Sequence, residues 1–199
     1  SVNGVFCLST SYRNEPYPIE GRHDLIFPMF EFEAKGELSD LTILEEELLH
    51  HLGFKEEPEF VSYIEMCKLY KTKTLEVQHE AQLQEDYGNI VFLMNFPLRT
   101  HPFWNMKHYK NLIFNKVDVI LHGMETFGSA ERSTSVEEMR QNFMSISDGK
   151  YARLLFSQFG EYRVLKELDD YLSLEMFPRF GAGIGITRLV RAMKLSNLL

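Results

Sequence analysis

Apolar and polar positions alternate along the first part of the chain in a way that predicts two β-strands. Residues 5–12 are rich in β-prone side chains and lead directly into Arg13-Asn14-Glu15. Two prolines and a glycine between residues 16 and 21 then interrupt regular structure. Residues 25–34 follow with an alternation that is rich in aromatic side chains and predicts a second strand. The loop between them predicts an antiparallel pair.

The next segment changes from a period of two to helical spacing. Leucines at positions 41, 44, 48, 49 and 52 lie on one face of a helix. Asp40 is expected to cap the start of this helix, and Gly53 is expected to end it. Further along, Ser135 opens a capping box. The remaining predicted helices cover residues 60–70, 75–85 and 151–174.

Two further segments, residues 89–96 and 116–121, are apolar enough to be central strands of a sheet. Near the C-terminus, residues 181–193 predict a glycine-rich strand that turns into a helix. These elements together predict an α+β fold, with a mainly antiparallel sheet flanked by helices. The first strand is expected to lie in the core of that sheet.

Composition narrows the class of protein. The chain has 199 residues, 44% of them hydrophobic, which suits one domain with a sizeable core. It has neither a secretory signal nor an apolar run near the roughly 20 residues that span a bilayer. Cys7 and Cys67 belong to no paired motif, so we expect two buried thiols in a reducing cytoplasm. The net charge of −8 disfavours broad capture of nucleic acid, although a local basic patch could still supply contacts.

The first candidate site lies at the end of the first predicted strand. Arg13 and Glu15 are two positions apart, so both side chains are expected on one face. An arginine can grip a phosphate, and a carboxylate can accept from an exocyclic amine. A surface ion pair is the simpler interpretation of this spacing. Arg22 and His23, just before the second strand, add donors suited to phosphate oxygens.

The second predicted strand has an unusual face. Period-two alternation puts Phe27, Met29, Glu31 and Glu33 on one side of the strand. Burying unpaired carboxylates is costly, so this face is expected to meet solvent, a cation or a ligand. A solvated outer face would be the simplest interpretation if the two apolar side chains were not interleaved with the acids.

Two more segments carry candidate chemistry. Glu125 and Arg132 flank a short segment that by itself suggests a hairpin turn, but the carboxylate could hold Mg²⁺ and the arginine could bind a substrate carboxylate. The segment from Gly181 to Arg188 has glycines that let the backbone pass close to a ligand. Its spacing matches neither the dinucleotide-binding fingerprint nor the P-loop.

Taken in order, these segments resemble the motifs of class II aminoacyl-tRNA synthetases. Tyr12-Arg13-Asn14-Glu15, Arg22-His23 and the strand to Glu33 are similar to motif 2 of that class, and Gly183-Ile184-Gly185-Ile186-Thr187-Arg188 is similar to motif 3. Val117-Asp118-Val119-Ile120, followed by Glu125 and Arg132, resembles the aspartate/asparagine subgroup, which includes related stand-alone asparagine synthetases. The resemblance spans most of the chain and implies the fold already predicted.

The resemblance implies a role for each candidate residue in ATP-dependent formation of an aminoacyl-adenylate. Arg13, Arg188 and Glu125 would be catalytic, and Glu125 would hold Mg²⁺. Glu31, His101 and Arg132 would bind the amino acid. The residues implied in ATP binding are Arg13, Glu15, Arg22, His23, Phe27, Glu125, Gly183, Gly185 and Arg188.

Departures from the family pattern leave several alternatives open. Ile26 and Thr187 stand where glutamates are common, and Gly128 stands where serine is common. Met29 and Glu31 resemble asparaginyl enzymes, whereas His101-Pro102-Phe103 resembles aspartyl ones, so the substrate is asparagine or aspartate. The acceptor is tRNA or ammonia. A catalytically silent paralogue with a binding or regulatory role is the alternative from another class.

The same comparison bears on domain organisation. No segment resembles motif 1, which builds the dimer interface of the class, or the anticodon-binding barrel. We therefore expect a single catalytic domain over residues 1–199 that is truncated at both ends. The full-length protein is expected to be a cytoplasmic homodimer with no membrane contact.

Overall fold

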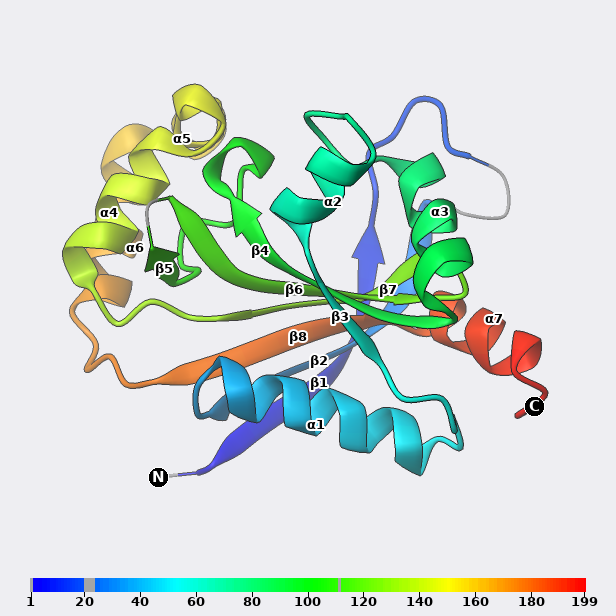
Figure 1. Ribbon diagram of the computed structural model, residues 1–199. Helices are drawn as coiled ribbons and strands as arrows, with labels where there is room; N and C mark the ends of the chain where they lie inside the picture. Colours follow the sequence, from blue (N-terminus) through cyan, green and yellow to red (C-terminus); the bar gives the residue numbers. More distant parts are fainter. Residues whose placement is uncertain (1, 20–23, 111) are drawn as a thin grey trace.

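The computed structural model describes residues 2–19, 24–110 and 112–199, and its centre is one mixed sheet (Figure 1). Seven strands follow the order β1-β2-β8-β7-β6-β4-β3, and β5 pairs with β6 beside them. The β3–β4 pair is parallel and the other pairs are antiparallel. The strands are Gly4–Tyr12 (β1), Ile26–Lys35 (β2), Glu59–Ser62 (β3), Ile90–Pro97 (β4), His108–Lys110 (β5), Ile113–Leu121 (β6), Met124–Glu131 (β7) and Arg179–Gly185 (β8).

Helices flank this sheet, which confirms the α+β prediction. In Figure 1, α1 and α7 lie on one side of the sheet, α2 and α3 lie on the other, and α4, α5 and α6 gather at one end. Two 3₁₀ turns, Leu98–Thr100 (η1) and Ile146–Gly149 (η2), connect elements. The helices are Leu38–His51 (α1), Tyr63–Leu69 (α2), Val77–Tyr87 (α3), Val136–Ser145 (α4), Lys150–Phe159 (α5), Glu161–Leu172 (α6) and Ile186–Leu195 (α7).

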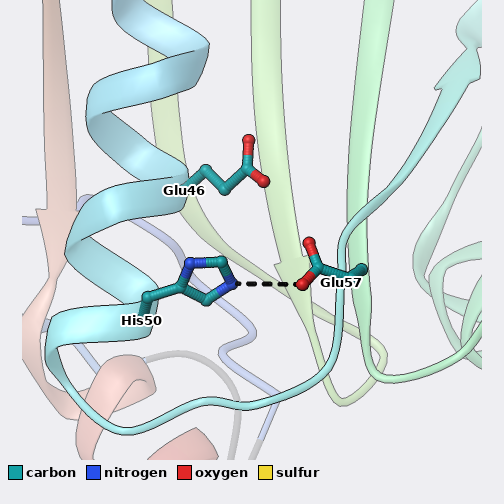
Figure 2. Close-up of side chains that lie close together, drawn as sticks. All are labelled: Glu46, His50 and Glu57. Carbon is teal, nitrogen blue, oxygen red and sulfur yellow. Dashed lines mark ion pairs between the residues drawn. The ribbon is translucent and has the colours of Figure 1, made fainter.

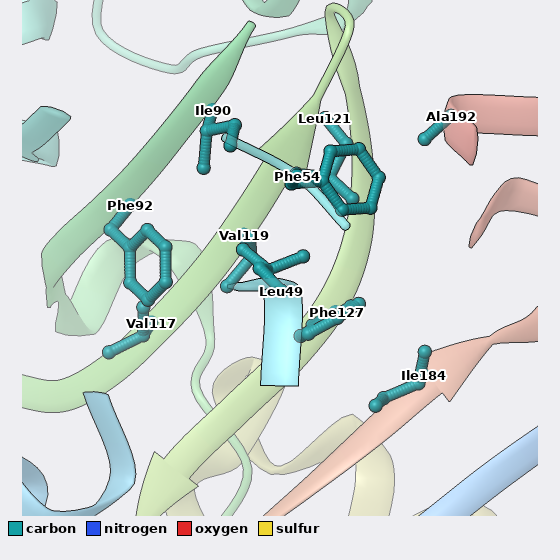
Figure 3. Packing of buried hydrophobic residues seen from close by; sticks show 10 residues of the cluster. All are labelled: Leu49, Phe54, Ile90, Phe92, Val117, Val119, Leu121, Phe127, Ile184 and Ala192. Carbon is teal, nitrogen blue, oxygen red and sulfur yellow. The ribbon is translucent and has the colours of Figure 1, made fainter. Parts of the chain in front are cut away.

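The core follows these layers. Leu49 on α1 and Ala192 on α7 pack against inward-facing side chains of β4, β6, β7 and β8 (Figure 3). A second cluster lies between the opposite sheet face and helices α2 and α3, and a third joins α4, α5 and α6. Phe30 and Phe32 of β2 pack against the first cluster, so the other face of β2, with its carboxylates, is turned away from the core. The alternation predicted for this strand is therefore confirmed.

The start of α1 differs from the prediction. Asp40 is the third helical residue and not the N-cap, which is Glu37. The Asp40 carboxylate accepts a hydrogen bond from the Glu37 backbone N–H at 2.8 Å. An acid in the first turn stabilises a helix start without occupying the cap itself. Ser135 does cap α4 as predicted, because its side chain accepts from the backbone N–H of Glu138.

Two further expectations about secondary structure were wrong. Residues 60–70 begin as strand β3, which pairs with β4, and become helical only at Tyr63. Residues 126–131 form most of strand β7, and the turn of the hairpin lies earlier, at His122-Gly123. Both turn residues have positive φ, 47° and 69°, which suits the right-handed twist of the flanking strands.

Strand β1 is an edge strand and not the core strand that its composition suggested. Phe6 and Leu8 are 74% and 76% exposed. Cys7, expected to be buried, is exposed as well, whereas Cys67 is buried as expected. The sequence shows that β1 is β-prone, but only the strand order decides that it has one neighbour. Among the described residues, no helix has the length and apolar character that crossing a membrane requires.

Candidate active site

Arg13 and Arg188, near opposite ends of the chain, line one cavity of about 700 Å³ (the first cavity). Arg13 follows β1, and Arg188 lies in the first turn of α7 directly after β8. These elements meet because β2, the neighbour of β1, pairs with β8. Phe27, Met29, Glu125, Gly183 and Gly185 contribute to the same wall, together with Thr187 and the start of α3.

Glycines keep the floor of the first cavity open. Glu31 of β2, Gly183 of β8, Gly128 of β7 and Asp118 of β6 form one row across four neighbouring strands. A Cβ atom on Gly183 would lie 2.8 Å from the end of the Met29 side chain. The row therefore presents bare backbone between the two acidic ends, which allows a ligand to approach closely.

Arg13 contacts the other side chains predicted beside it. Its Nη1 lies 3.6 Å from the Glu15 carboxylate, and its Cζ lies 5.4 Å from the centre of the Phe27 ring. The ion pair is only about one-third exposed on each side. The surface ion pair considered from spacing is therefore present, but it lies at the wall of a cavity. Arg22 and His23 lie outside the described residues.

Arg188 is held against the metal candidate. Its Nη1 donates to the Glu125 backbone oxygen at 2.6 Å and lies 3.9 Å from the Glu125 carboxylate. The Glu125 backbone N–H donates in turn to the carboxylate of Glu80 on α3, at 2.8 Å. The backbone of the predicted metal ligand is thus held from two sides while its side chain is 42% exposed.

Asp118 is a site residue to which the sequence analysis assigned no role. Burial raises the pKa of its carboxyl to about 7; Lys116 opposes this shift, and the negative charges of Glu125 and Glu80 add to it. Lys116 also forms a short hydrogen-bonded ion pair with it. A Cβ on Gly128 would touch both carboxylates, of Glu125 and of Asp118, at 3.4 and 3.9 Å. The signal in the sequence was an acid inside an otherwise apolar strand.

The acids of β2 lie in an adjoining cavity of about 310 Å³ (the second cavity), which also contains Arg132 and Cys7. Arg132 donates from Nε and Nη2 to one oxygen of Glu33, at 2.9 and 2.7 Å. The Ser9 hydroxyl donates to the carboxylate of Glu31. Gly183 lines both this cavity and the first one, so the two cavities share a wall.

His101 lies elsewhere. It lines a third cavity of about 430 Å³ with Asp118 and Lys116, and this cavity shares Glu80 and Glu125 with the first. It also lines a more apolar fourth cavity of about 750 Å³ near the end of α4. Its backbone has a positive φ of 52°. His101 and Arg132 therefore line different cavities, and the contact of His101 with a substrate side chain stays a prediction.

The family of tRNA synthetases class II (D, K and N) matches residues 1–197. The chain belongs to this family. Three solved structures agree on the fold, each with a TM-score of 0.74 and with 96% of this chain covered. An aspartyl-tRNA synthetase from Entamoeba histolytica is 16% identical, with 44% of its own chain covered. Two asparaginyl-tRNA synthetases complexed with asparaginyl-adenylate, from Pyrococcus horikoshii and Entamoeba histolytica, are 18% and 17% identical, each with 49% covered.

This synthetase domain therefore spans about half the length of the enzymes that share its fold. No curated protein sequence is significantly similar to it. The family and the fold predicted from the motifs are both confirmed. The order of the motifs was the decisive signal, because the identity to each neighbour is low.

Proposed function

We propose that this domain activates asparagine or aspartate with ATP to give an aminoacyl-adenylate and pyrophosphate. The observation that carries the proposal is the shared wall at Gly183 between the first and second cavities. An amino acid held by Glu31 and Arg132 would have its α-carboxylate beside the phosphates of a nucleotide in the first cavity. Membership of a family of aminoacyl-tRNA ligases supports the same reaction class.

The reaction makes small demands on side-chain chemistry. A carboxylate oxygen of the amino acid forms a bond to the α-phosphorus, and the bond from that phosphorus to the pyrophosphate oxygen breaks. The carboxylate is already ionised, so no side chain has to remove a proton. The chain contributes positioning and charge neutralisation. Arg13 neutralises the α-phosphate, and Arg188 neutralises the outer phosphates.

The nucleotide base is proposed to lie between Phe27 and Arg188, with Glu15 accepting from the adenine amine. Gly183 and Gly185 let the backbone approach the nucleotide. Arg13 now lies over the Phe27 ring, so nucleotide binding would move it from the ring toward the phosphates. Arg22 and His23 are proposed to contact the outer phosphates.

The donor set also fits Mg²⁺. This ion prefers one or two carboxylates together with phosphate oxygens and water, and the carboxylates of Glu125 and Asp118 both face the space above Gly128. Glu125 is the proposed ligand, with Asp118 beside it. When bound, the ion would neutralise the charge that develops on the phosphate oxygens.

The second cavity favours asparagine over aspartate. Ser9 orients the Glu31 carboxylate, which is proposed to take the α-ammonium group. Arg132 is already paired with Glu33, and the second carboxylate oxygen of Glu33 is buried without a hydrogen-bond partner among the described residues. A carboxamide would match this pair once the Glu33 carboxylate turns toward the cavity, because its N–H would then donate to Glu33 while its oxygen accepts from Arg132. An aspartate carboxylate would face Glu33 with like charge.

The acceptor of the adenylate is proposed to be tRNA or ammonia. Transfer to tRNA would consume an α-carboxyl adenylate of asparagine or aspartate, with a hydroxyl group of the tRNA as nucleophile and AMP as leaving group. Amide formation would consume a β-carboxyl adenylate of aspartate, with ammonia as nucleophile and AMP as leaving group. A cytoplasmic location and a homodimeric full-length protein belong to this proposal. Incubation of the protein with ATP, either amino acid, and tRNA or ammonium separates the acceptors by product, which is aminoacyl-tRNA or, from aspartate, asparagine.

ATP–pyrophosphate exchange driven by single amino acids tests the activation step. Exchange with asparagine, and more weakly with aspartate, is expected. The alternative, a silent paralogue, is favoured by Thr187 in the first cavity and by Ile26, 63% exposed where the family has a glutamate. Absence of exchange with any amino acid in the full-length protein, together with retained binding of asparagine or ATP, would establish that alternative.

A further inference from the structure

Three side chains with metal-ligating atoms meet near the C-terminal end of α1, and none of them lines the cavities described above (Figure 2). Glu46 and His50 are one helical turn apart, so both side chains project from the same side of α1. Glu57 reaches them from the loop between α1 and β3. One ligand atom of each residue lies within 4.8 Å of the other two. His50 Nε2 and Glu57 Oε1 are 4.0 Å apart.

The loop that carries Glu57 is anchored by the residues that directly precede it. Gly53 ends α1 with a φ of 101°, and Phe54 is buried in the first core cluster with its backbone N–H bonded to Leu49. The carboxylate of Glu56 accepts from the Asn89 side chain at 2.8 and 3.0 Å. Glu57 is therefore brought to the helix by contacts that are independent of its own side chain.

We propose that Glu46, His50 and Glu57 bind a divalent transition-metal ion, with Zn²⁺ the best match. One imidazole nitrogen and two carboxylate oxygens are ligands that Zn²⁺ accepts, and three protein ligands leave a position for water. Ligand atoms 2.0–2.2 Å from one ion are at most about 4.4 Å apart. The His50–Glu57 pair already meets this limit, and the other pairs need only a small rotation of an exposed side chain.

Electrostatics favour a cation at this position. Two carboxylates and a neutral imidazole balance a charge of 2+, and the carbonyl groups at the end of α1 add partial negative charge. Among the described residues, neither Glu46 nor Glu57 forms an ion pair with lysine or arginine. The imidazole selects transition metals over Mg²⁺ and Ca²⁺, which prefer oxygen ligands. The bound ion ties the end of α1 to the loop before β3.

Calorimetric titration of the chain with Zn²⁺ at pH 7.5 tests the site. His50→Ala should weaken the binding at least tenfold, and Glu57→Gln should weaken it less. His51→Ala, the adjacent exposed histidine on the same helix turn, is the matched control and should bind like the wild type. Glu125→Gln alters the acidic group of the first cavity. It should leave unchanged the part of the Zn²⁺ titration that is lost in His50→Ala.

Thermal unfolding gives a second readout that does not involve catalysis. Zn²⁺ should raise the Tm of the wild type and of His51→Ala, but not that of His50→Ala. Zn²⁺ affinity in His50→Ala equal to that of the wild type, or no saturable binding by the wild type, would overturn the proposal.

Discussion

Glu33 on β2 pairs with Arg132 just beyond β7, across the intervening strand β8. The contact passes over Gly181, the β8 residue aligned with Glu33. A Cβ atom at Gly181 would overlap the Glu33 carboxylate. A glycine at this one position therefore lets an acid and an arginine from non-adjacent strands meet in the second cavity.

Glu33→Gln should lower the preference for asparagine over aspartate. The substitution removes the like charge facing an aspartate side chain and frees Arg132 to bind it. We expect the ratio of the two kcat/KM values in pyrophosphate exchange to fall by roughly 10–100-fold, about the worth of one hydrogen bond to a charged group. The matched control is Glu31→Gln, which should weaken both amino acids alike because both have an α-ammonium group. An unaltered ratio in Glu33→Gln would remove Glu33 from the specificity pocket.

Arg132→Ala should abolish discrimination for the amide or acidic side chain while ATP binding is retained. Arg132 lines the second cavity and not the first, so the nucleotide loses no contact. Amino-acid affinity measured by calorimetry, alongside the affinity for a non-hydrolysable ATP analogue, separates the two effects. If amino-acid affinity stayed at the wild-type value, Arg132 would lie outside the substrate pocket.

Arg188→Ala should weaken ATP binding by roughly 10–100-fold, because a charge-assisted contact to phosphate is worth about 1.5–3 kcal/mol. The loss should be larger at low salt, where charge interactions are less screened. Lys194→Ala, an exposed residue on the same helix, is the control. Equal nucleotide affinity in Arg188→Ala and the wild type would show that the glycine-rich segment has been assigned wrongly.

Gly183→Ala should weaken the binding of both substrates and change the stability of the protein only slightly. The new methyl group would meet the flexible end of Met29, which can move aside at low energetic cost. It would also take up space in both cavities beside their shared wall. Calorimetry should report weaker binding of both ATP and asparagine, while thermal unfolding reports a similar Tm. Loss of affinity for only one substrate would contradict a shared wall.

Glu45 on α1 should make stability depend on pH. Its side chain is fully buried, and the nearby Ser129 hydroxyl donates to Val117, so the carboxyl oxygens have no hydrogen-bond partner among the described residues. Burial raises the pKa of Glu45 from 4.5 to about 8, and the charge of Asp118 adds to this shift. The folded state then binds more protons than the unfolded state between these values, so the free energy of unfolding falls as pH rises from about 4.5 to 8.

Glu45→Gln should remove the Glu45 part of this dependence and stabilise the protein at pH 8 relative to the wild type, while the part due to the raised pKa of Asp118 is retained. The gain is at most on the order of 3–5 kcal/mol, since each pKa unit corresponds to about 1.4 kcal/mol. Urea unfolding at several pH values measures it. Glu46→Gln, the next residue and a partly exposed one, is the control. If the free energy of unfolding varied with pH in the same way in Glu45→Gln and the wild type, the pKa of Glu45 would not be raised by folding.

Local patterns in the sequence determined much of this protein. The alternation in β2 predicted which face carries Phe27, Met29, Glu31 and Glu33, because side chains on a strand alternate between its two faces. The glycine-rich segment predicted a strand leading into a helix, and the order of the motifs predicted the family. The first two signals are each contained in a few neighbouring residues, and the order of the motifs is read directly along the chain, so all three can be seen without knowledge of the tertiary structure.

Only the tertiary structure decided which residues meet. Strand order made β1 an exposed edge and brought Arg13 to the same cavity as Arg188. Pairing of Phe60 and Val61 with β4 overrode the helix expected there. The register of β2, β8, β7 and β6 aligned Glu31, Gly183, Gly128 and Asp118, and allowed Glu33 to reach Arg132. Register depends on hydrogen bonds and packing between segments far apart in the chain, and a local hydrophobic pattern does not specify the partner strand.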